Sequence, residues 1–132
     1  MPPGAFSFVG CRMKEPLNPA GAEVGPTLGS AMQSRHGVGL RNEHFPAIVA
    51  GEARGRVGFF EIISENFLVP GGRPLAVLDK VRKDFPILMH GVSLSIGGSD
   101  RLNLSYLKDL RALAHRVQPE WVSDHLCWGT AA

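Results

Sequence analysis

The sequence predicts an α/β fold in which parallel strands alternate with helices. Short runs of β-branched and aromatic residues alternate with longer segments whose apolar residues recur at helical spacing, and this alternation is typical of strand–helix–strand units. The strand candidates are apolar on both faces, as expected of a sheet that helices cover. Polar side chains able to bind a metal follow each strand candidate, which favours a β/α barrel whose site lies at the carboxyl ends of the strands.

The first four elements are predicted between residues 38 and 86. Residues 38–40 form a short apolar strand, residues 44–50 a short helix, and residues 56–64 a strand rich in aromatic and β-branched residues. A longer helix begins at Pro74, since proline suits a first helical turn, and ends before Pro86. The apolar stripe of this helix consists of Leu75, Leu78, Val81 and Phe85.

Three further elements complete the pattern. Residues 87–94 form a third strand, residues 103–117 the clearest helix of the chain, and residues 120–126 a fourth strand after Pro119. The apolar stripe of the clearest helix consists of Leu104, Leu107, Leu110, Leu113 and Val117.

The chain is predicted to divide into two parts. Residues 1–35 are dense in Gly, Pro, Ala and Ser and show no periodicity, so we expect a disordered extension there. Residues 36–132 form the α/β unit. An open doubly wound sheet and a barrel both fit that unit. The "GVG" at 37–39 lies before and within the first strand, the wrong place for a phosphate-binding turn, so the barrel is favoured.

Composition excludes several classes of protein. The formal net charge is +2 with scattered basic residues, which disfavours nucleic-acid binding. No run reaches the roughly 18 apolar residues of a membrane helix, and no signal peptide is recognisable. Cys11 and Cys127 lie too far apart in the chain for a disulfide framework or a zinc motif, so we expect two free thiols and a cytoplasmic location.

The polar residues at the strand ends suggest a divalent metal. Imidazole, carboxylate and amide groups together suit iron, manganese or zinc, and the absence of a thiolate argues against a closed structural zinc site. The candidates are His44 after the first strand, Glu61, Glu65 and Asn66 at the second, His90 at the third, and Asp124 and His125 at the fourth.

Each candidate also has a purely structural interpretation. His44 would cap the short helix, and His90 would be a core histidine bonded to a backbone carbonyl. Glu61 requires a partner such as Arg41 or a metal, because an unpaired carboxylate within a strand is costly. Glu65 and Asn66 would be turn residues. Asp124 and His125 point to opposite sides of a strand, so the sequence leaves open which of the two binds.

Four segments, in order, closely resemble the signatures of the DUF692 family, also called UPF0276 or the multinuclear non-heme iron oxidases: "GVGLRNEH", "FFEIISENF", "HGVSLSIGGSDRLNLSYLKDLRAL" and "PEWVSDHLCW". The resemblance covers about residues 37–128. It implies a β/α (TIM-type) barrel related to the xylose-isomerase-like barrels. It also implies two or three iron ions, dioxygen as co-substrate, and modification of cysteine-containing ribosomal precursor peptides beside a partner protein that presents the peptide.

The resemblance also implies roles for individual residues. His44, Asn66, His90 and Asp124 would be iron ligands. Glu65 and His125 would act catalytically beside the metal or serve as alternative ligands.

The chain departs from the family pattern after "HLCW", where "GTAA" stands in place of a continuing barrel. We expect a barrel truncated to about four β/α units, inactive alone, because closure takes about eight strands. Three outcomes stay open: a frameshifted or prematurely stopped product, self-association or pairing with a complementing second half, and a loosely folded remnant.

Two rival functions stay open. One is a divalent-metal isomerase or phosphoesterase of the related barrel superfamily, and the other is a non-catalytic interaction module.

Overall fold

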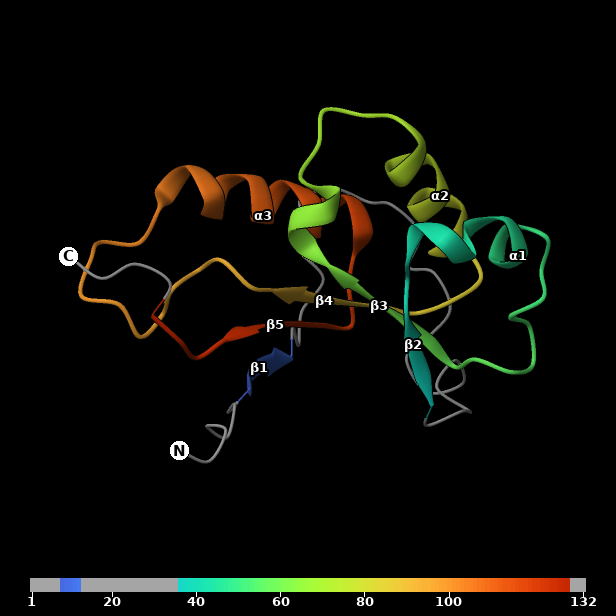
Figure 1. The fold of residues 1–132 in the computed structure, drawn as a ribbon, viewed down its shortest axis with the longest axis horizontal. Coiled ribbons are helices and arrows are strands. Elements are labelled where there is room, and N and C mark those ends of the chain that lie inside the picture. Colours follow the sequence, from blue (N-terminus) through green and yellow to red (C-terminus); the bar gives the residue numbers. More distant parts are fainter. Residues whose placement is uncertain (1–7, 13–35, 129–132) are drawn as a thin grey trace, which may run out of the picture.

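A computed structural model describes residues 8–12 and 36–128 of the 132-residue chain. The described elements alternate between strands and helices over most of the chain (Figure 1). In order they are β1 (Phe8–Arg12), β2 (Gly37–Gly39), the 3₁₀ turn η1 (Asn42–His44), α1 (Phe45–Val49), β3 (Phe59–Ile63), the 3₁₀ turn η2 (Ser64–Phe67), α2 (Arg73–Val81), β4 (Ile87–Gly91), α3 (Leu104–Val117) and β5 (Trp121–His125).

The five strands form one sheet in the order β1-β5-β4-β3-β2. The four strands β2 to β5 are parallel and follow one another in chain order, whereas β1 pairs antiparallel with β5. All three α-helices lie on one side of this sheet (Figure 1). The chain is therefore an α/β fold, and its four sequential parallel strands are consistent with part of a barrel.

The helices begin and end where local chemistry favours it. Proline occupies the first turn of α2, as predicted. The Asn103 side chain caps α3 by accepting hydrogen bonds from the backbone N–H groups of Ser105 and Tyr106 at 3.0 and 3.1 Å. Gln118 ends α3 in the left-handed region with φ 52°. The cap at Asn103 fixes the first turn of α3, and with it the position of Tyr106.

The core lies between the sheet and the helices. Phe60 and Ile62 of β3 are completely buried on this side, while their neighbours Glu61 and Ile63 are exposed. The alternation defines a covered face, which packs against the helices, and an open face, against which no helix packs among the described residues.

The structure differs from the sequence predictions at three points. β1 lies inside the segment 1–35, for which we expected disorder; the rest of that segment lies outside the described residues, so the division of the chain into two parts stays a prediction. The reason is that the edge of β5 offers backbone hydrogen bonds that a strand can satisfy. The predicted extent of the second helix is too long, because α2 ends at Val81 and turns fill the residues before Pro86.

The third correction concerns the apolar stripe of α3. Leu104, expected to face the core, is 77% exposed in the first turn of the helix, whereas Leu113 and Val117 are buried. Leu104 therefore points away from the core, while Leu113 and Val117 pack into it. In the described part of the chain, no helix is long and apolar enough to span a bilayer.

Candidate functional site

The strand register divides the predicted ligands between the two faces of the sheet. Residues paired across neighbouring strands share a face, and His90 pairs with Ser123 while Gly91 pairs with Asp124. His90, Ser123 and His125 therefore lie on the open face, and Asp124 lies on the covered face under the helices. Asp124 and His125 therefore lie in different environments, and which of the two binds a metal stays open.

The open-face group consists of two histidines and a serine. The imidazole rings of His90 and His125 lie with their centroids 4.8 Å apart and tilted by 55°. Nδ1 of His90 is 2.9 Å from Oγ of Ser123, and that hydroxyl lies 3.5 Å from the Met89 carbonyl oxygen, to which it donates. The contact between Nδ1 and the hydroxyl orients the His90 ring, and the tautomer of His90 decides which of the two donates. A side-chain hydroxyl therefore holds one nitrogen of His90, and its interpretation as a core histidine bonded to a backbone carbonyl stays a prediction.

The covered-face group is centred on Glu65 of η2. Oε1 of Glu65 accepts hydrogen bonds from the backbone N–H of Val92 at 2.8 Å and from the Tyr106 hydroxyl at 2.7 Å. Its other oxygen, Oε2, is buried and has no hydrogen-bond partner among the described residues. Glu65 is therefore not an ordinary turn residue, because its carboxylate joins the loop after β4 to the first turn of α3.

Asp124 completes the covered-face group. Its side chain is 95% buried, since only 5% of its surface is exposed, and neither carboxylate oxygen has a hydrogen-bond partner in the described chain. A β-carbon added at Gly91 would collide with Oδ2 of Asp124 and approach the Tyr106 hydroxyl to 3.0 Å. The bare glycine therefore makes room for the carboxylate and the phenol above β4.

The pKa values of the two carboxylates, Glu65 and Asp124, are shifted in opposite directions. Burial acts to raise the pKa of Glu65, but the hydrogen bonds from Val92 and Tyr106 outweigh burial and hold that pKa below its usual value. Burial raises the pKa of Asp124; the nearby N–H groups of His125 and Leu94 oppose this, and the charge of Glu65 adds to it. The surroundings of Asp124 therefore favour its neutral form more than water does, and those of Glu65 favour its ionised form.

His44 and Asn66 lie apart from the interactions that define both groups. Both side chains are exposed; Asn66 lines a cavity of about 220 Å³ beside β2 and β3, together with Arg41 and Glu61. His44 occupies the position before α1 but makes no capping hydrogen bond, so the predicted cap is wrong. Glu61 is exposed, so it does not need the partner that we expected of a buried carboxylate.

The predicted ligands do not assemble into one cluster in the described part of the chain. No group of three or more His, Cys, Asp or Glu side chains there is arranged to hold a metal ion. The structure instead brings together two pairs, His90 with His125 and Glu65 with Asp124. The assignment of His44, Asn66, His90 and Asp124 as ligands stays a prediction.

Sequence reasoning missed Tyr106. The signal available was the "NLSY" segment: an asparagine at the start of a helix fixes the first turn, and the tyrosine lies three residues later. The sequence does not reveal that this turn packs against η2, and this packing brings the Tyr106 hydroxyl to Glu65.

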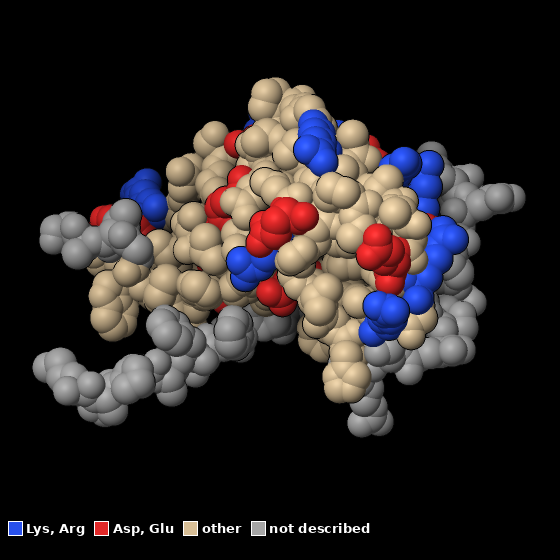
Figure 2. Space-filling model, turned by 45° about the vertical axis from the view of Figure 1, so that its right-hand side comes forward, with Lys and Arg blue, Asp and Glu red and all other residues tan. Residues whose placement is uncertain are grey.

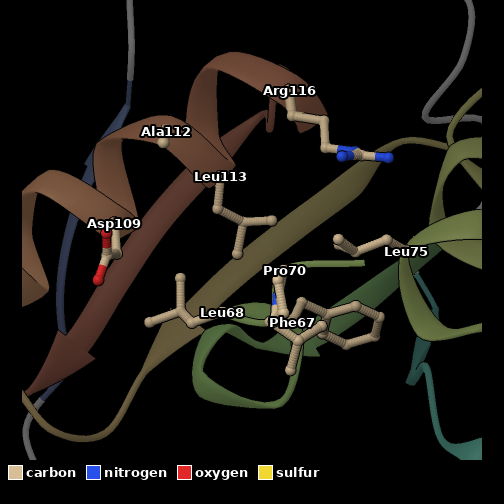
Figure 3. A pocket seen from close by; sticks show the side chains of 9 residues that line it. Phe67, Leu68, Pro70, Leu75, Asp109, Ala112, Leu113 and Arg116 are labelled. Carbon is tan, nitrogen blue, oxygen red and sulfur yellow. The ribbon is translucent and has the colours of Figure 1, made fainter. Parts of the chain in front are cut away.

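A second cavity, of about 320 Å³, lies on the helix side of the molecule. Figure 3 shows Phe67, Leu68 and Leu113 pointing into it, with Asp109 and Arg116 on α3 beside them. Arg116 also pairs with Asp79 of α2 at 2.6 Å. The cavity includes none of the predicted ligands, and we interpret it as a packing gap between α3 and the segment that follows η2.

Surface charge of both signs is visible on the face drawn in Figure 2, where acidic side chains lie beside the basic ones. Arg54, for example, pairs with Asp84 at 2.8 Å. Cys127 carries a free thiol, as expected, whereas the side chain of Cys11 lies outside the described residues.

Comparison with known proteins identifies the family. The model of a family described as "RiPP precursor modification enzyme MbnB/TglH/ChrH" matches residues 35–132. A UPF0276 protein of Anaeromyxobacter sp. (strain Fw109-5) is 58% identical over 95 residues, which are 72% of this chain and 33% of that protein. A UPF0276 protein of Caulobacter vibrioides is 55% identical over 92 residues, 70% of this chain and 32% of its own.

More distant relatives match the same region. A UPF0276 protein of Bordetella pertussis is 41% identical over 97 residues, 74% of this chain and 33% of its own. The chain thus spans about a third of the length of these relatives. The matched region contains both pairs of candidate side chains, and the chain belongs to the UPF0276 family, the family of the MbnB/TglH/ChrH-type precursor modification enzymes.

Proposed function

We propose that this chain forms part of an iron-dependent oxidase that uses dioxygen to modify cysteine-containing ribosomal precursor peptides. The observation that carries the proposal is that the family match spans residues 35–132 and includes donor side chains at the carboxyl ends of β3, β4 and β5. In this proposal, the four parallel strands are the first part of a β/α barrel, and its interior is the open face of the sheet.

Two properties of these side chains suit a divalent metal: they are of ligand type, and several of their oxygen atoms lack a hydrogen-bond partner among the described residues. Three buried carboxylate oxygens, two from Asp124 and one from Glu65, have no hydrogen-bond partner among the described residues. Such oxygens suit a cation, and imidazoles such as His90 and His125 suit iron. Iron, when bound, would supply the activation of dioxygen. The protein would supply donors held in fixed orientation, as the Ser123 hydroxyl holds His90.

The remaining donors would come from elsewhere, because the described residues contribute only pairs. Sequence beyond the described residues, a second copy of the chain or a complementing chain would add them. Exposed apolar side chains between β4 and α3, in the first turn of α3 and after β5 support a partner chain or a bound peptide. They are Ile96, Leu102, Leu104, Leu126 and Trp128.

Iron binding by the purified chain tests the proposal. The protein is prepared under nitrogen, ferrous iron is added, unbound iron is removed, and iron per chain is measured by plasma mass spectrometry. We expect bound iron in the wild type, a clear loss in His90→Ala, and no loss in His115→Ala. His115 is a matched control because its side chain is exposed on α3, away from both pairs.

Two other results would support the rival functions. Binding of manganese or zinc in preference to iron, without consumption of dioxygen, would favour a metal isomerase or phosphoesterase. The interaction module has a specific observation in its favour, since no three donors of the His, Cys, Asp or Glu type converge among the described residues. Failure to bind any divalent metal, together with a stable dimer in size-exclusion chromatography, would replace the oxidase proposal with that module.

A further inference from the structure

We infer that Tyr106 is a positioning residue, whose hydroxyl holds Oε1 of Glu65 so that Oε2 is the oxygen left to receive a cation or a proton. The inference rests on the proposed function for what Oε2 receives. The positioning itself rests on contacts that are independent of any metal. Tyr106 is not among the residues predicted to act in the site.

The Glu65 carboxylate is anchored from two elements distant in sequence. The backbone N–H of Val92, just after β4, donates to Oε1 at 2.8 Å, and the Tyr106 hydroxyl, from the first turn of α3, donates to the same oxygen at 2.7 Å. Hydrogen bonds to a carboxylate are short and strong when the acceptor is ionised. Two donors on one oxygen fix the rotamer of Glu65 and direct the unpartnered Oε2 away from both.

The position of the phenol is itself fixed. Asn103 caps the helix and accepts a hydrogen bond from the backbone N–H of Tyr106 at 3.1 Å. Gly91 leaves the space above β4 in which the Tyr106 hydroxyl and the Asp124 carboxylate both lie. The phenol therefore stands at the junction of the two carboxylates, where it satisfies one oxygen of Glu65 and approaches Asp124 without bonding it.

The hydroxyl, and not the aromatic ring, carries the inference. A phenylalanine at position 106 would fill the same volume against η2 but would donate no hydrogen bond. Oε1 would then lose one of its two donors, and the carboxylate would be held less firmly. Tyr106→Phe therefore separates positioning from packing.

The experiment compares wild type, Tyr106→Phe and the control Ser105→Ala, in which a neighbouring exposed side chain of α3 is shortened. Two measurements are made on metal-free protein: the thermal midpoint, and amide hydrogen exchange at Val92. A third measurement titrates each variant with cobalt(II) and obtains the affinity from the visible absorption of the bound ion. In the wild type and the control, the near-ultraviolet band of the single tyrosine is followed as well.

We expect Tyr106→Phe to keep its thermal midpoint within a few degrees, to exchange the Val92 amide about fivefold faster, and to bind cobalt(II) about tenfold more weakly. Ser105→Ala should match the wild type in all three. The tyrosine band of the wild type should shift as cobalt(II) binds beside it.

The outcomes separate this inference from the proposed function. Unchanged Val92 exchange and unchanged cobalt(II) affinity in Tyr106→Phe would overturn the positioning role while leaving the metal site standing. Faster Val92 exchange in a protein whose wild type binds no cobalt(II) would support the positioning role and count against the metal function. A large fall in thermal midpoint with unchanged Val92 exchange would show that Tyr106 is only a packing residue.

Discussion

The two faces of the sheet hold their polar groups in different ways. On the open face, the rings of His90 and His125 lie side by side and tilted, and a serine hydroxyl holds the first ring. On the covered face, Asp124 is buried without a hydrogen-bond partner among the described residues, next to a glutamate that a tyrosine and a backbone N–H hold in place. Asp124 and His125 are adjacent in the chain, yet they belong to these two different groups.

The comparison shows that the alternation of side chains along a strand decides the chemical environment of each residue. Successive side chains of β5 alternate between the faces, so one step along the chain moves a group from beneath α3 to the open side of the sheet. The imidazoles lie on the face against which no helix packs among the described residues. Carboxylates on the covered face are placed where burial alters their ionisation. Three predictions test this difference.

The largest expected effect contrasts two adjacent aromatic residues of β3. Phe60 is completely buried on the covered face and contacts the ring of Phe85 edge-to-face at 5.1 Å, whereas Phe59 is half-buried on the open face. Phe60→Ala should lower the free energy of unfolding by about 3–5 kcal/mol. Phe59→Ala should lower it by about 1 kcal/mol. Urea denaturation of both variants measures the contrast, and equal losses would refute the assignment of the two faces.

A smaller effect is expected at the glycine beneath the covered-face group. In Gly91→Ala the new methyl group would collide with the Asp124 carboxylate and crowd the Tyr106 hydroxyl, so stability should fall by about 1–3 kcal/mol. The matched control is Gly39→Ala in β2, where the nearest atom is Nε of the flexible Arg41 side chain at 3.5 Å. Thermal unfolding compares them. A Gly91→Ala protein as stable as Gly39→Ala would contradict the close packing above β4.

The smallest effects concern the pH dependence of the two carboxylates. The pKa of Asp124 is raised in the folded state, so its charge opposes folding at neutral pH and this penalty disappears below the unfolded pKa. The pKa of Glu65 is lowered, so its charge favours folding at neutral pH and this contribution is lost as pH falls through the folded pKa. Asp124→Asn should therefore stabilise the protein at pH 7, and Glu65→Gln should destabilise it.

The effect of Asp124→Asn should shrink towards pH 3, because a carboxylate with a raised pKa is then protonated in the wild type. The effect of Glu65→Gln should shrink only as pH falls through the folded pKa of Glu65, which lies below its usual value. Unfolding free energies measured by urea denaturation at several pH values test this. A stabilising effect of Asp124→Asn that persists unchanged at pH 3 would mean that the amide acts through packing or hydrogen bonding, and not through removal of the buried charge.

Much of the fold was predictable because local patterns specify it. The strand at residues 56–64 and the helix at 103–117 correspond to β3 and α3, since aromatic and β-branched runs and helical spacing are local properties. The strand β1 was not predictable, because five residues with no periodicity become a strand only when the β5 edge is present to pair with them. Leu104 was misassigned because helical spacing does not reveal how far the sheet extends beneath α3.

The candidate site was predictable only in part. The sequence identified His90, Glu65 and Asp124, since polar residues at the ends of apolar strands stand out. It did not identify Tyr106, because the partner of that hydroxyl lies 41 residues away in the chain.

By itself the sequence determined the α/β class, the order of the parallel strands and helices, and the residue types available for chemistry, because these depend on short-range periodicity and on side-chain identity. Only the tertiary structure decided which of those residues share a face. That decision depends on the register between strands and on the packing of α3 over β4, which place Asp124 beside Glu65 and His125 beside His90.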